Sequence, residues 1–411
     1  MTGRVVIIGA GAVGIATALS AAEQGLEVDV IDRDAPASGA SHGNAGVISP
    51  WSCVPVSLPG LWRSVPRWLF DPEGPLSVRP AYALRFAPWA LRFLAAGREA
   101  RLPAIADAMH ALSRPSADLY RQMLSGTGSE HLVVDSLYLH VSRRETVSLD
   151  GPAWRLRAAR GVPFRQVGAE ELREIEPALA PEYRSAVVIE GQARSLDPGG
   201  VGRALAAKAE GFGVRFHRTA VTALAREGED WTVSTEAGAH RARQVVLAAG
   251  AWSARLLRPL GIRVPLEAER GYHLVLKSPG VEVRNSVMET ERKFVASGMA
   301  AGVRLAGTAE FAGLDAAPDW RRAEVLKGHA ERLFPGIATG DAEVWMGSRP
   351  SLPDSLPCIG PVPGQPGLVV AFGHSHFGFG MAPATGRLVA QLLRGIAPNV
   401  DMAPYRVERF A

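Results

Sequence analysis

The chain has 411 residues, of which 47% are hydrophobic and 21% are charged. This composition allows a large core and excludes general disorder, and the length indicates two or three domains. The net charge of +4 is too small for a nucleic-acid footprint, and two cysteines without metal-ligand spacing exclude a disulfide framework and a cysteine metal site. These features predict a cytoplasmic α/β enzyme with no nucleic-acid partner.

The first elements predict a βαβ unit. Arg4–Ile8 is a short β-branched run typical of a buried parallel strand, a helix follows over 12–24, and a second strand covers 27–31. The uncharged stretch 5–22 imitates a signal peptide or a short membrane span, but the glycines inside it favour a nucleotide-binding turn. No other stretch is long and apolar enough to span a bilayer.

The rest of the chain alternates between helical and strand periods. Residues 50–101 are rich in Pro, Trp and Arg and predict an irregular excursion with short helices. Beyond it, helices are predicted over 104–123, 170–175, 199–211, 319–333 and 383–394, and strands over 133–141, 214–217, 220–225, 231–235, 245–248, 272–276, 287–290, 294–297, 303–308 and 368–371.

The sharpest motif is the sequence GAGAVG at residues 9–14, between the first strand and the first helix. Gly9 permits the tight turn, Gly11 lets backbone approach a pyrophosphate, and Gly14 lets helix and strand pack closely. Asp32 ends the second strand, where its carboxylate can accept ribose hydroxyls and disfavours a 2′-phosphate. The unit therefore predicts a dinucleotide other than NADP.

Three later segments favour FAD over NAD. The loop 39–50 (GASHGNAGVISP) is dense in small residues that can lie against a flat ring system. Residues 245–253 (VVLAAGAWS) predict a strand that ends in small residues, and residues 373–386 (GHSHFGFGMAPATG) run into the last helix. The N-terminus of that helix carries partial positive charge, which suits a reduced flavin.

Together these motifs resemble the D-amino acid oxidase/dehydrogenase (DAO) superfamily of FAD-dependent oxidoreductases, closest to bacterial D-amino acid dehydrogenases and D-hydroxyproline dehydrogenase-like enzymes. The resemblance rests on residues 9–14 with Asp32 and on the segments 43–50, 248–253, 270–272, 347–354 and 373–386. It implies an α/β (α+β two-domain) fold like that of glycine oxidase and D-amino acid oxidase. A Rossmann-like FAD-binding domain is expected from residues 1–84, 194–262 and 340–411, and a substrate domain on a mostly antiparallel sheet from residues 85–193 and 263–339.

The resemblance also implies how FAD is held. Sarcosine oxidases that bind flavin covalently carry a cysteine shortly before the Pro-Asp pair at 353–354, and this chain does not, so FAD is expected to bind non-covalently. The expected cofactor-binding residues are Gly9, Ala10, Gly11, Ala12, Val13, Gly14, Asp32, Arg33, Ser41, His42, Asn44, Ala45, Gly46, Val47, Val221, Ala249, Gly250, Trp252, Gly373, His374, Phe377, Gly378, Gly380 and Met381.

Five residues are expected to bind substrate. Arg349 lies in a GxRPxxPD pattern, where such enzymes place the arginine that pairs with the substrate carboxylate. Tyr272 and His273 fall on the strand where relatives carry a tyrosine facing the substrate, although a half-buried aromatic on a sheet fits equally well. His376 occupies the position of an arginine in glycine oxidases, and Arg304 lies on a candidate cavity strand. No side chain is expected to act as acid or base, and no metal is expected.

The implied reaction is FAD-dependent oxidative deamination of an amino acid in amino acid catabolism, by hydride transfer from Cα to flavin N5, giving an imino acid. A D-amino acid is the favoured substrate. Cyclic imino acids (D-proline, hydroxy-D-proline) and glycine- or sarcosine-type amines stay open, with a quinone or oxygen as electron acceptor. From other classes, an NAD-linked dehydrogenase and a non-catalytic nucleotide-binding protein also stay open.

Residues 61–102 interleave aromatic and aliphatic residues with arginines. Such a pattern predicts either contact with a membrane surface, at the inner face of the cell membrane, or a hydrophobic cover over the substrate pocket. The cover is the favoured interpretation.

Overall fold

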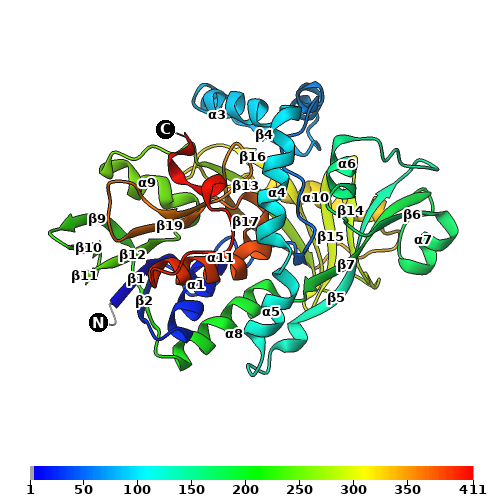
Figure 1. Cartoon of the computed structure of the whole chain (residues 1–411). Helices are drawn as coiled ribbons and strands as arrows, with labels where there is room; N and C mark the ends of the chain where they lie inside the picture. Colours follow the sequence, from blue (N-terminus) through cyan, green and yellow to red (C-terminus); the bar gives the residue numbers. More distant parts are fainter. Residues whose placement is uncertain (1–3, 411) are drawn as a thin grey trace.

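The computed structural model describes residues 4–410, and a mostly parallel six-stranded sheet forms one side of the molecule (Figure 1). Its strand order is β18-β19-β12-β1-β2-β8, and only β18 is antiparallel to its neighbour. The central strands are short apolar runs buried on both faces, as is typical of parallel sheets. The strands span Arg4–Ile8 (β1), Glu27–Asp32 (β2), Arg215–Arg218 (β8), Gln244–Leu247 (β12), Cys358–Pro361 (β18) and Leu368–Phe372 (β19).

Helices cover one face of this sheet, and a three-stranded meander covers the other. The helices are α1 (Ala12–Glu23), α8 (Pro198–Gly211) and α11 (Gly378–Leu393). α1 and α11 cross so closely that a Cβ on Gly386 would lie 2.5 Å from the backbone of Ala16. The meander consists of β9 (Val221–Glu227), β10 (Asp230–Thr235) and β11 (Gly238–Ala242), with α9 (Ser253–Leu257) nearby. This layering confirms the predicted Rossmann-like domain.

A ten-stranded sheet forms the other side of the molecule (Figure 1). Its main order is β17-β13-β16-β15-β14-β5-β7-β3, with β4 beside β16 and β6 beside β7. Every pairing is antiparallel except β14 with β5 and β16 with β4, which confirms the predicted mostly antiparallel sheet. α10 (Arg321–Leu333) covers one face, where Leu274, Leu305 and Leu326 are fully buried. The strands span Val47–Ile48 (β3), Leu76–Val78 (β4), Val133–Ser142 (β5), Phe164–Gly168 (β6), Ser185–Ser195 (β7), Glu267–Leu276 (β13), Ser286–Glu289 (β14), Phe294–Met299 (β15), Gly302–Phe311 (β16) and Ala342–Ser351 (β17).

Strands from both predicted domains contribute to this sheet. β3, β4 and β17 belong to ranges that the sequence analysis places in the FAD-binding domain, whereas the other strands lie mainly in the substrate ranges. The domain boundaries stay a prediction. None of the helices between residues 4 and 410 has the length and hydropathy that a transmembrane segment needs. The uncharged stretch 5–22 is β1, the glycine turn and most of α1.

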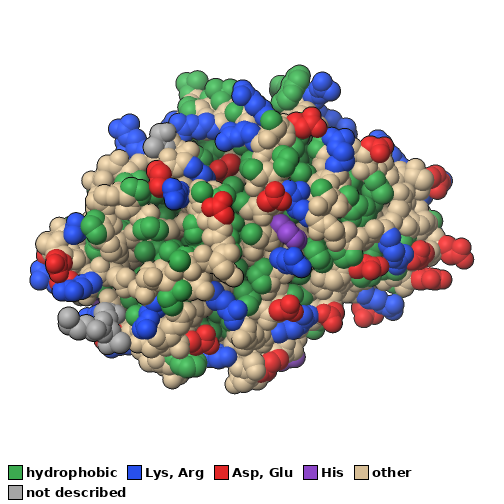
Figure 2. Space-filling view, in the orientation of Figure 1, with side chains coloured by type: hydrophobic (Ala, Val, Ile, Leu, Met, Phe, Trp, Pro, Cys, Tyr) green, Lys and Arg blue, Asp and Glu red, His purple; other side chains and the backbone are tan. Residues whose placement is uncertain are grey.

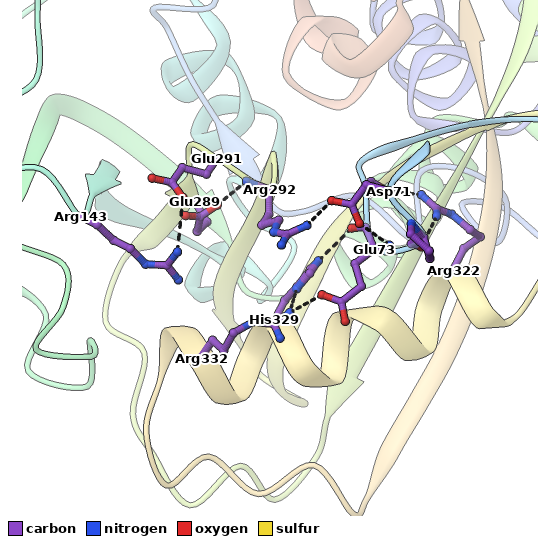
Figure 3. Close-up of polar contacts among 11 residues, drawn as sticks. Asp71, Glu73, Arg143, Glu289, Glu291, Arg292, Arg322, His329 and Arg332 are labelled. Carbon is purple, nitrogen blue, oxygen red and sulfur yellow. Dashed lines mark hydrogen bonds and ion pairs between the residues drawn. The ribbon is translucent and has the colours of Figure 1, made fainter. Parts of the chain in front are cut away.

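The predicted excursion of short helices extends from the core at the top of Figure 1. It contains α2 (Val65–Phe70) and α3 (Ala83–Ala96). Figure 3 shows how it is fastened: Arg292 pairs with Asp71 at 2.6 Å, and Arg332 on α10 pairs with Glu73 at 2.8 Å. β4 adds a parallel pairing to β16. The connection between α2 and α3 therefore attaches the excursion to the ten-stranded sheet and α10.

One predicted helix is wrong in extent. Residues 104–123 form two helices, α4 (Leu102–Ser113) and α5 (Ser116–Leu124), because Pro115 between them lacks the N–H that would continue the first. Seven strands were not predicted: β3, β4, β6, β7, β11, β17 and β18. Helix α6 (Pro152–Ala158) was not predicted either, whereas α7 (Ala169–Ile175) matches the helix predicted over 170–175.

The last helix begins earlier than predicted. It starts at Gly378 and contains Pro383, which cannot donate a backbone hydrogen bond to the carbonyl of Phe379. The hydroxyl of Tyr120 on α5 donates to that carbonyl instead, at 2.6 Å. A side chain from a neighbouring helix therefore satisfies the group that the proline leaves open, so the helix can extend toward the space between the two sheets.

Candidate active site

One large cavity, of about 1340 Å³, is lined by residues from both sheets and from the excursion. The six-stranded side contributes the turn 9–13, Asp32 and the segments 248–252 and 374–380. The ten-stranded side contributes one face of its strands, including Glu269 and Arg349. This volume exceeds that of an ordinary small-molecule pocket, so the cavity can hold a cofactor together with a substrate.

The turn at residues 9–14 accepts only glycine at its ends. Gly9 has a φ of +112°, and a Cβ there would lie 2.4 Å from the carbonyl oxygen of Ala248. A Cβ on Gly14 would lie 1.8 Å from the carbonyl oxygen of Gly9. The N–H of Ala10 donates to Oδ2 of Asp32 at 2.7 Å, which ties the turn to the end of β2. The first-turn N–H groups of α1 therefore point at the cavity, as a pyrophosphate requires.

The loop 42–46 is held from behind by two residues that the sequence analysis assigned to substrate. Arg304 donates hydrogen bonds to the carbonyl oxygens of His42, at 2.9 Å, and Asn44, at 2.7 Å. The ring of His273 lies 3.1 Å from the carbonyl oxygen of Gly43 through Nδ1. Both side chains are buried, and neither borders the cavity. The structure therefore does not bring them to Arg349, and they support the loop instead.

Burial lowers the pKa values of both His273 and Arg304. Burial and the nearby charge of Arg304 lower the pKa of His273 to about 3. The imidazole of His273 is therefore neutral. Burial also lowers the pKa of Arg304 to about 10, which still leaves the guanidinium protonated at neutral pH. One cation therefore holds two backbone carbonyls in place. A Cβ on Gly43 would lie 1.9 Å from the ring of Trp345, so the loop also needs glycine there.

The N-terminus of α11 forms another wall of the cavity. Gly378 and Gly380 border it, and a Cβ on Gly380 would meet no atom within 4 Å, so the backbone faces open space. Before the helix, Nε2 of His374 lies 3.0 Å from Oγ1 of Thr385, and burial lowers the pKa of His374 to about 3. The helix thus directs its first-turn N–H groups and partial positive charge into the cavity. Glycine turn, small-residue loop and helix N-terminus together fit FAD.

Arg349 lies at the centre of a buried polar cluster. Its Nη1 donates to Oε1 of Glu269 at 2.9 Å, and Nε2 of His376 lies 2.6 Å from the same oxygen. Ser351 donates to the other carboxylate oxygen at 2.8 Å. Burial disfavours ionisation of Glu269, but the charges of His376 and Arg349 and the hydrogen bond from Ser351 outweigh it. They hold its pKa well below the usual range. Glu269 is therefore an ionised, fully engaged carboxylate.

The guanidinium of Arg349 lies directly on a glycine. A Cβ on Gly271 would lie 2.3 Å from its Cζ, so any larger residue there would displace it. Glu269 and Arg349 are directly opposite each other on β13 and β17, and both side chains enter the cavity. Among residues 4–410, Nε and Nη2 of Arg349 form no hydrogen bond. Two donors of a planar cation are thus available to a carboxylate in the cavity.

Tyr272 lies elsewhere. It follows Glu269 by three positions, and β13 pairs in unbroken register with β17 there, although the pairing with β16 has a bulge between Arg270 and Tyr272. Its side chain therefore points to the opposite face of the sheet. There its hydroxyl donates to Oε2 of Glu310 at 2.6 Å and accepts from the N–H of Asp319 at 2.9 Å. Burial and the carboxylate of Glu310 raise the pKa of Tyr272 to about 12. Although Tyr272 touches the cavity wall, its hydroxyl is not brought together with Arg349.

Most of the residues expected at the cofactor border the cavity. Arg33 also stacks on the ring of Trp252, 4.0 Å from its centroid. The expected cofactor residues that do not border the cavity are Gly14, His42, Gly46, Gly373 and Met381. The side chain of His42 points toward Gly199 and Trp345. Gly14, Gly46, Gly373 and His42 pack closely behind the cavity walls, and Met381 is fully buried.

Glu269 was not predicted as a site residue. The strand predicted at 272–276 begins at 267 in the structure, so Glu269 lay outside the pattern that was considered. The signal was present: Glu267, Glu269 and Gly271 alternate with the residues that face α10. The opposite wall comes from the excursion and β16, through Phe86, Trp89, Phe93 and Phe311.

Comparisons with known proteins agree with this geometry. The family model for DAO, FAD dependent oxidoreductase, matches residues 4–392. A D-amino-acid oxidase of Bradyrhizobium diazoefficiens is 40% identical over 99% of both chains, and a D-amino acid dehydrogenase of the same organism is 32% identical over 99% of both. The crystal structure of glycine oxidase from Geobacillus kaustophilus superposes with a TM-score of 0.74 over 99% of both chains at 24% identity. The predicted two-domain fold is confirmed.

Proposed function

Because this chain belongs to the DAO family of FAD-dependent oxidoreductases, we propose that it oxidises the Cα–N bond of D-amino acids. Family membership makes it an FAD enzyme that acts on CH–NH₂ groups, so the NAD-linked and non-catalytic alternatives are set aside. The D-configuration is supported by the two relatives named D-amino-acid oxidase and D-amino acid dehydrogenase, which align over nearly their whole length.

The observation that carries this proposal is the position of Arg349 in the same cavity as the FAD cradle. The turn at 9–14, Asp32, the loop 43–47 and the first turn of α11 would hold the cofactor. When bound, FAD supplies the two-electron acceptor for the hydrogen on the substrate's Cα. Binding is expected to be non-covalent: Cys358 does not border the cavity, and burial raises the pKa of the Cys53 thiol, so little of it is the nucleophilic thiolate.

Arg349 binds the substrate carboxylate through Nε and Nη2 in this proposal. Glu269 holds Nη1, so the plane of the guanidinium is fixed before the substrate arrives. Ser351 and His376 in turn hold the carboxylate of Glu269. Because the pKa of Glu269 lies well below its usual range, we assign it no proton transfer. His376 borders the cavity next to Arg349, where its imidazole can contact the bound substrate.

The test is an anaerobic visible spectrum of the purified protein during addition of amino acids. Bleaching of the flavin band by D-methionine or D-alanine, and not by L-methionine, is the expected result. D-proline, glycine and sarcosine in the same series examine the cyclic and glycine-type alternatives. If only D-proline, glycine or sarcosine bleached the flavin band, the substrate class would be one of these and not the D-amino acids proposed. The rate of reoxidation by oxygen and by a soluble quinone then identifies the acceptor class.

We also propose that the outer face of the excursion contacts a membrane surface. α3 has two apolar faces: Phe86, Trp89 and Phe93 line the cavity, which supports the cover interpretation, whereas Leu84 is 90% exposed and Leu91 68% exposed. Figure 2 shows this outer face at the top of the molecule, with hydrophobic and basic side chains mixed. Such a surface suits an interface with anionic lipid.

Co-sedimentation with vesicles containing anionic phospholipid tests the membrane proposal. The wild-type protein should sediment with the vesicles, and the double variant L84S/L91S should do so several-fold less, with unchanged flavin absorbance. Since these side chains are exposed, the variant should fold normally. Equal sedimentation of both proteins would contradict the proposal and leave the cover as the only role of α3.

A further inference from the structure

The cavity extends along the ten-stranded sheet to a second polar region, which we call the distal recess. It comprises Tyr138, His140, Arg157 and Lys293, all of which border the cavity. Tyr138 and His140 lie on β5, Arg157 on α6 and Lys293 in the turn between β14 and β15. None of these residues belongs to the FAD cradle or to the Arg349 cluster.

No carboxylate of the described residues borders the distal recess; the charge of Glu289 acts on Lys293, but Glu289 does not border the cavity. The acidic residues that border the cavity are Asp32 and Asp34 at the cradle, Glu269 beside Arg349, and Asp315, which pairs with Arg255. Among residues 4–410, the side chains of Arg157 and Lys293 form no ion pair and no hydrogen bond. Nε of Arg157 and Nε2 of His140 are buried without a partner. The recess is therefore cationic and unsatisfied.

The electrostatics of His140 agree with this description. Burial lowers its pKa well below the usual value, and the charges of Arg157 and Lys293 lower it further. Both cations therefore lie close enough to act on the same imidazole. The groups that act on Arg157 are the thiol of Cys53 and the phenol of Tyr138, neither of which is ionised at neutral pH.

Arg157 is half-buried at the cavity wall, and its guanidinium stacks on the ring of Trp154, 4.6 Å from the centroid, without a carboxylate partner among the described residues. A cation placed so at a cavity wall points to an anion from outside the chain. The FAD phosphates do not supply it, because their place is the glycine turn at the six-stranded sheet. The chain runs from the FAD cradle to the distal recess: β3 follows the loop 43–46 and leads to Cys53, which lies close to Arg157. The anion must therefore come from the molecule that shares the cavity with the cofactor.

We propose that the distal recess binds a carboxylate on the side chain of the substrate, so that the enzyme prefers acidic D-amino acids. This inference rests on the proposed function, in which Arg349 holds the α-carboxylate. β15, which follows Lys293, lies three strands from β17, a separation of about 14 Å between backbones. The side chains of Arg349 and Lys293 extend into the space between these two strands from opposite ends. The space left between them is about the size of one amino acid.

The first experiment compares kcat/KM for D-glutamate and D-glutamine, which differ in charge but hardly in shape. We expect D-glutamate to be favoured by at least about tenfold, as a charge-assisted contact provides. D-aspartate and D-2-aminoadipate in the same assay report the distance between the two carboxylate sites. A ratio near one for D-glutamate over D-glutamine, and no preference for the other acidic substrates, would overturn the inference.

The second experiment removes the cation. Arg157→Met should bring the D-glutamate to D-glutamine ratio close to one, mainly through a higher KM for D-glutamate. Arg155→Met is the matched control, because Arg155 lies on the same helix but is exposed and pairs with Glu99. Lys293→Met provides a second route if Arg157→Met does not fold. A ratio that both variants leave unchanged would contradict the recess as the binding site.

The design separates this inference from the proposed function. Oxidation of D-methionine without any preference for acidic substrates rejects the distal recess and keeps the proposed function. Failure of every D-amino acid to bleach the flavin rejects both. Preference for D-glutamate that survives in Arg155→Met and is lost in Arg157→Met supports both.

Discussion

Arg349 and Arg157 border the same cavity, yet the chain treats their charges differently. Arg349 has Glu269 beside it at 2.9 Å, and that carboxylate is held by two further side chains. Arg157 has no such partner among the described residues. A cation that pairs with a carboxylate of the same chain is held in a fixed orientation before substrate binds. A cation without such a partner can pair with an anionic ligand instead. The two ends of the cavity should therefore respond in opposite ways when their charges are removed.

The largest expected effect is at the compensated end. Arg349→Met should lower kcat/KM for any D-amino acid by about 10²–10³-fold, because the substrate carboxylate loses two charge-assisted donors. FAD absorbance should not change, since Arg349 is not part of the cradle. Steady-state kinetics with D-methionine measures the effect. An unchanged KM for a carboxylate substrate would show that another cation binds it.

Glu269→Gln tests whether the ion pair between Glu269 and Arg349 stabilises the fold. It leaves Arg349 without its counter-charge in a largely buried setting, so the free energy of unfolding should fall by about 2–3 kcal/mol. Because Arg349 is then free to reorient, KM should rise more than kcat falls. Denaturant unfolding of the FAD-bound protein gives the first quantity and kinetics the second. Stability equal to that of the wild type would mean that the pair contributes nothing to the fold.

Acidification affects the two ends in different pH ranges. His140 takes up a proton in the unfolded chain below about pH 6.5 but not in the fold, where its pKa is depressed. Its contribution to stability is therefore present above pH 6.5 and is lost as pH falls. Between pH 7 and 5, His140→Gln should lose about 2 kcal/mol less stability than the wild type. Glu269 stays ionised in the fold over this range and should add no such dependence.

Arg157→Met should change stability in the direction opposite to Glu269→Gln. Replacing a half-buried guanidinium that has no carboxylate partner among the described residues by an apolar side chain of similar length should raise the free energy of unfolding by about 1 kcal/mol. Thermal unfolding of the holoenzyme without substrate measures the change. Destabilisation of that size or more would mean that the guanidinium is compensated after all, and the contrast between the two ends would fail.

The two sheets differ in how far the sequence predicts them. In the parallel sheet, Gly9, Gly14 and Asp32 act within one local βαβ unit, so their roles follow from spacing alone. In the ten-stranded sheet, the position of a side chain depends on register between strands far apart in the chain. That register places Glu269 opposite Arg349, which no local pattern indicates. Arg304 and His273 were placed on the correct sheet, but their contacts to the loop 42–44 depend on residues more than 200 positions away.

Tyr272→Phe is the smallest change and the sharpest test of register. The hydroxyl bonds Glu310 and Asp319 on the α10 face and does not face the substrate. Its loss should then cost about 1–1.5 kcal/mol of unfolding free energy and change kcat/KM by less than about twofold. A tyrosine that faced the substrate would give the reverse: little change in stability and a clear loss in kcat/KM. The two measurements on one variant therefore decide which face of β13 Tyr272 occupies, and with it whether Arg349 and Glu269 face the cavity together.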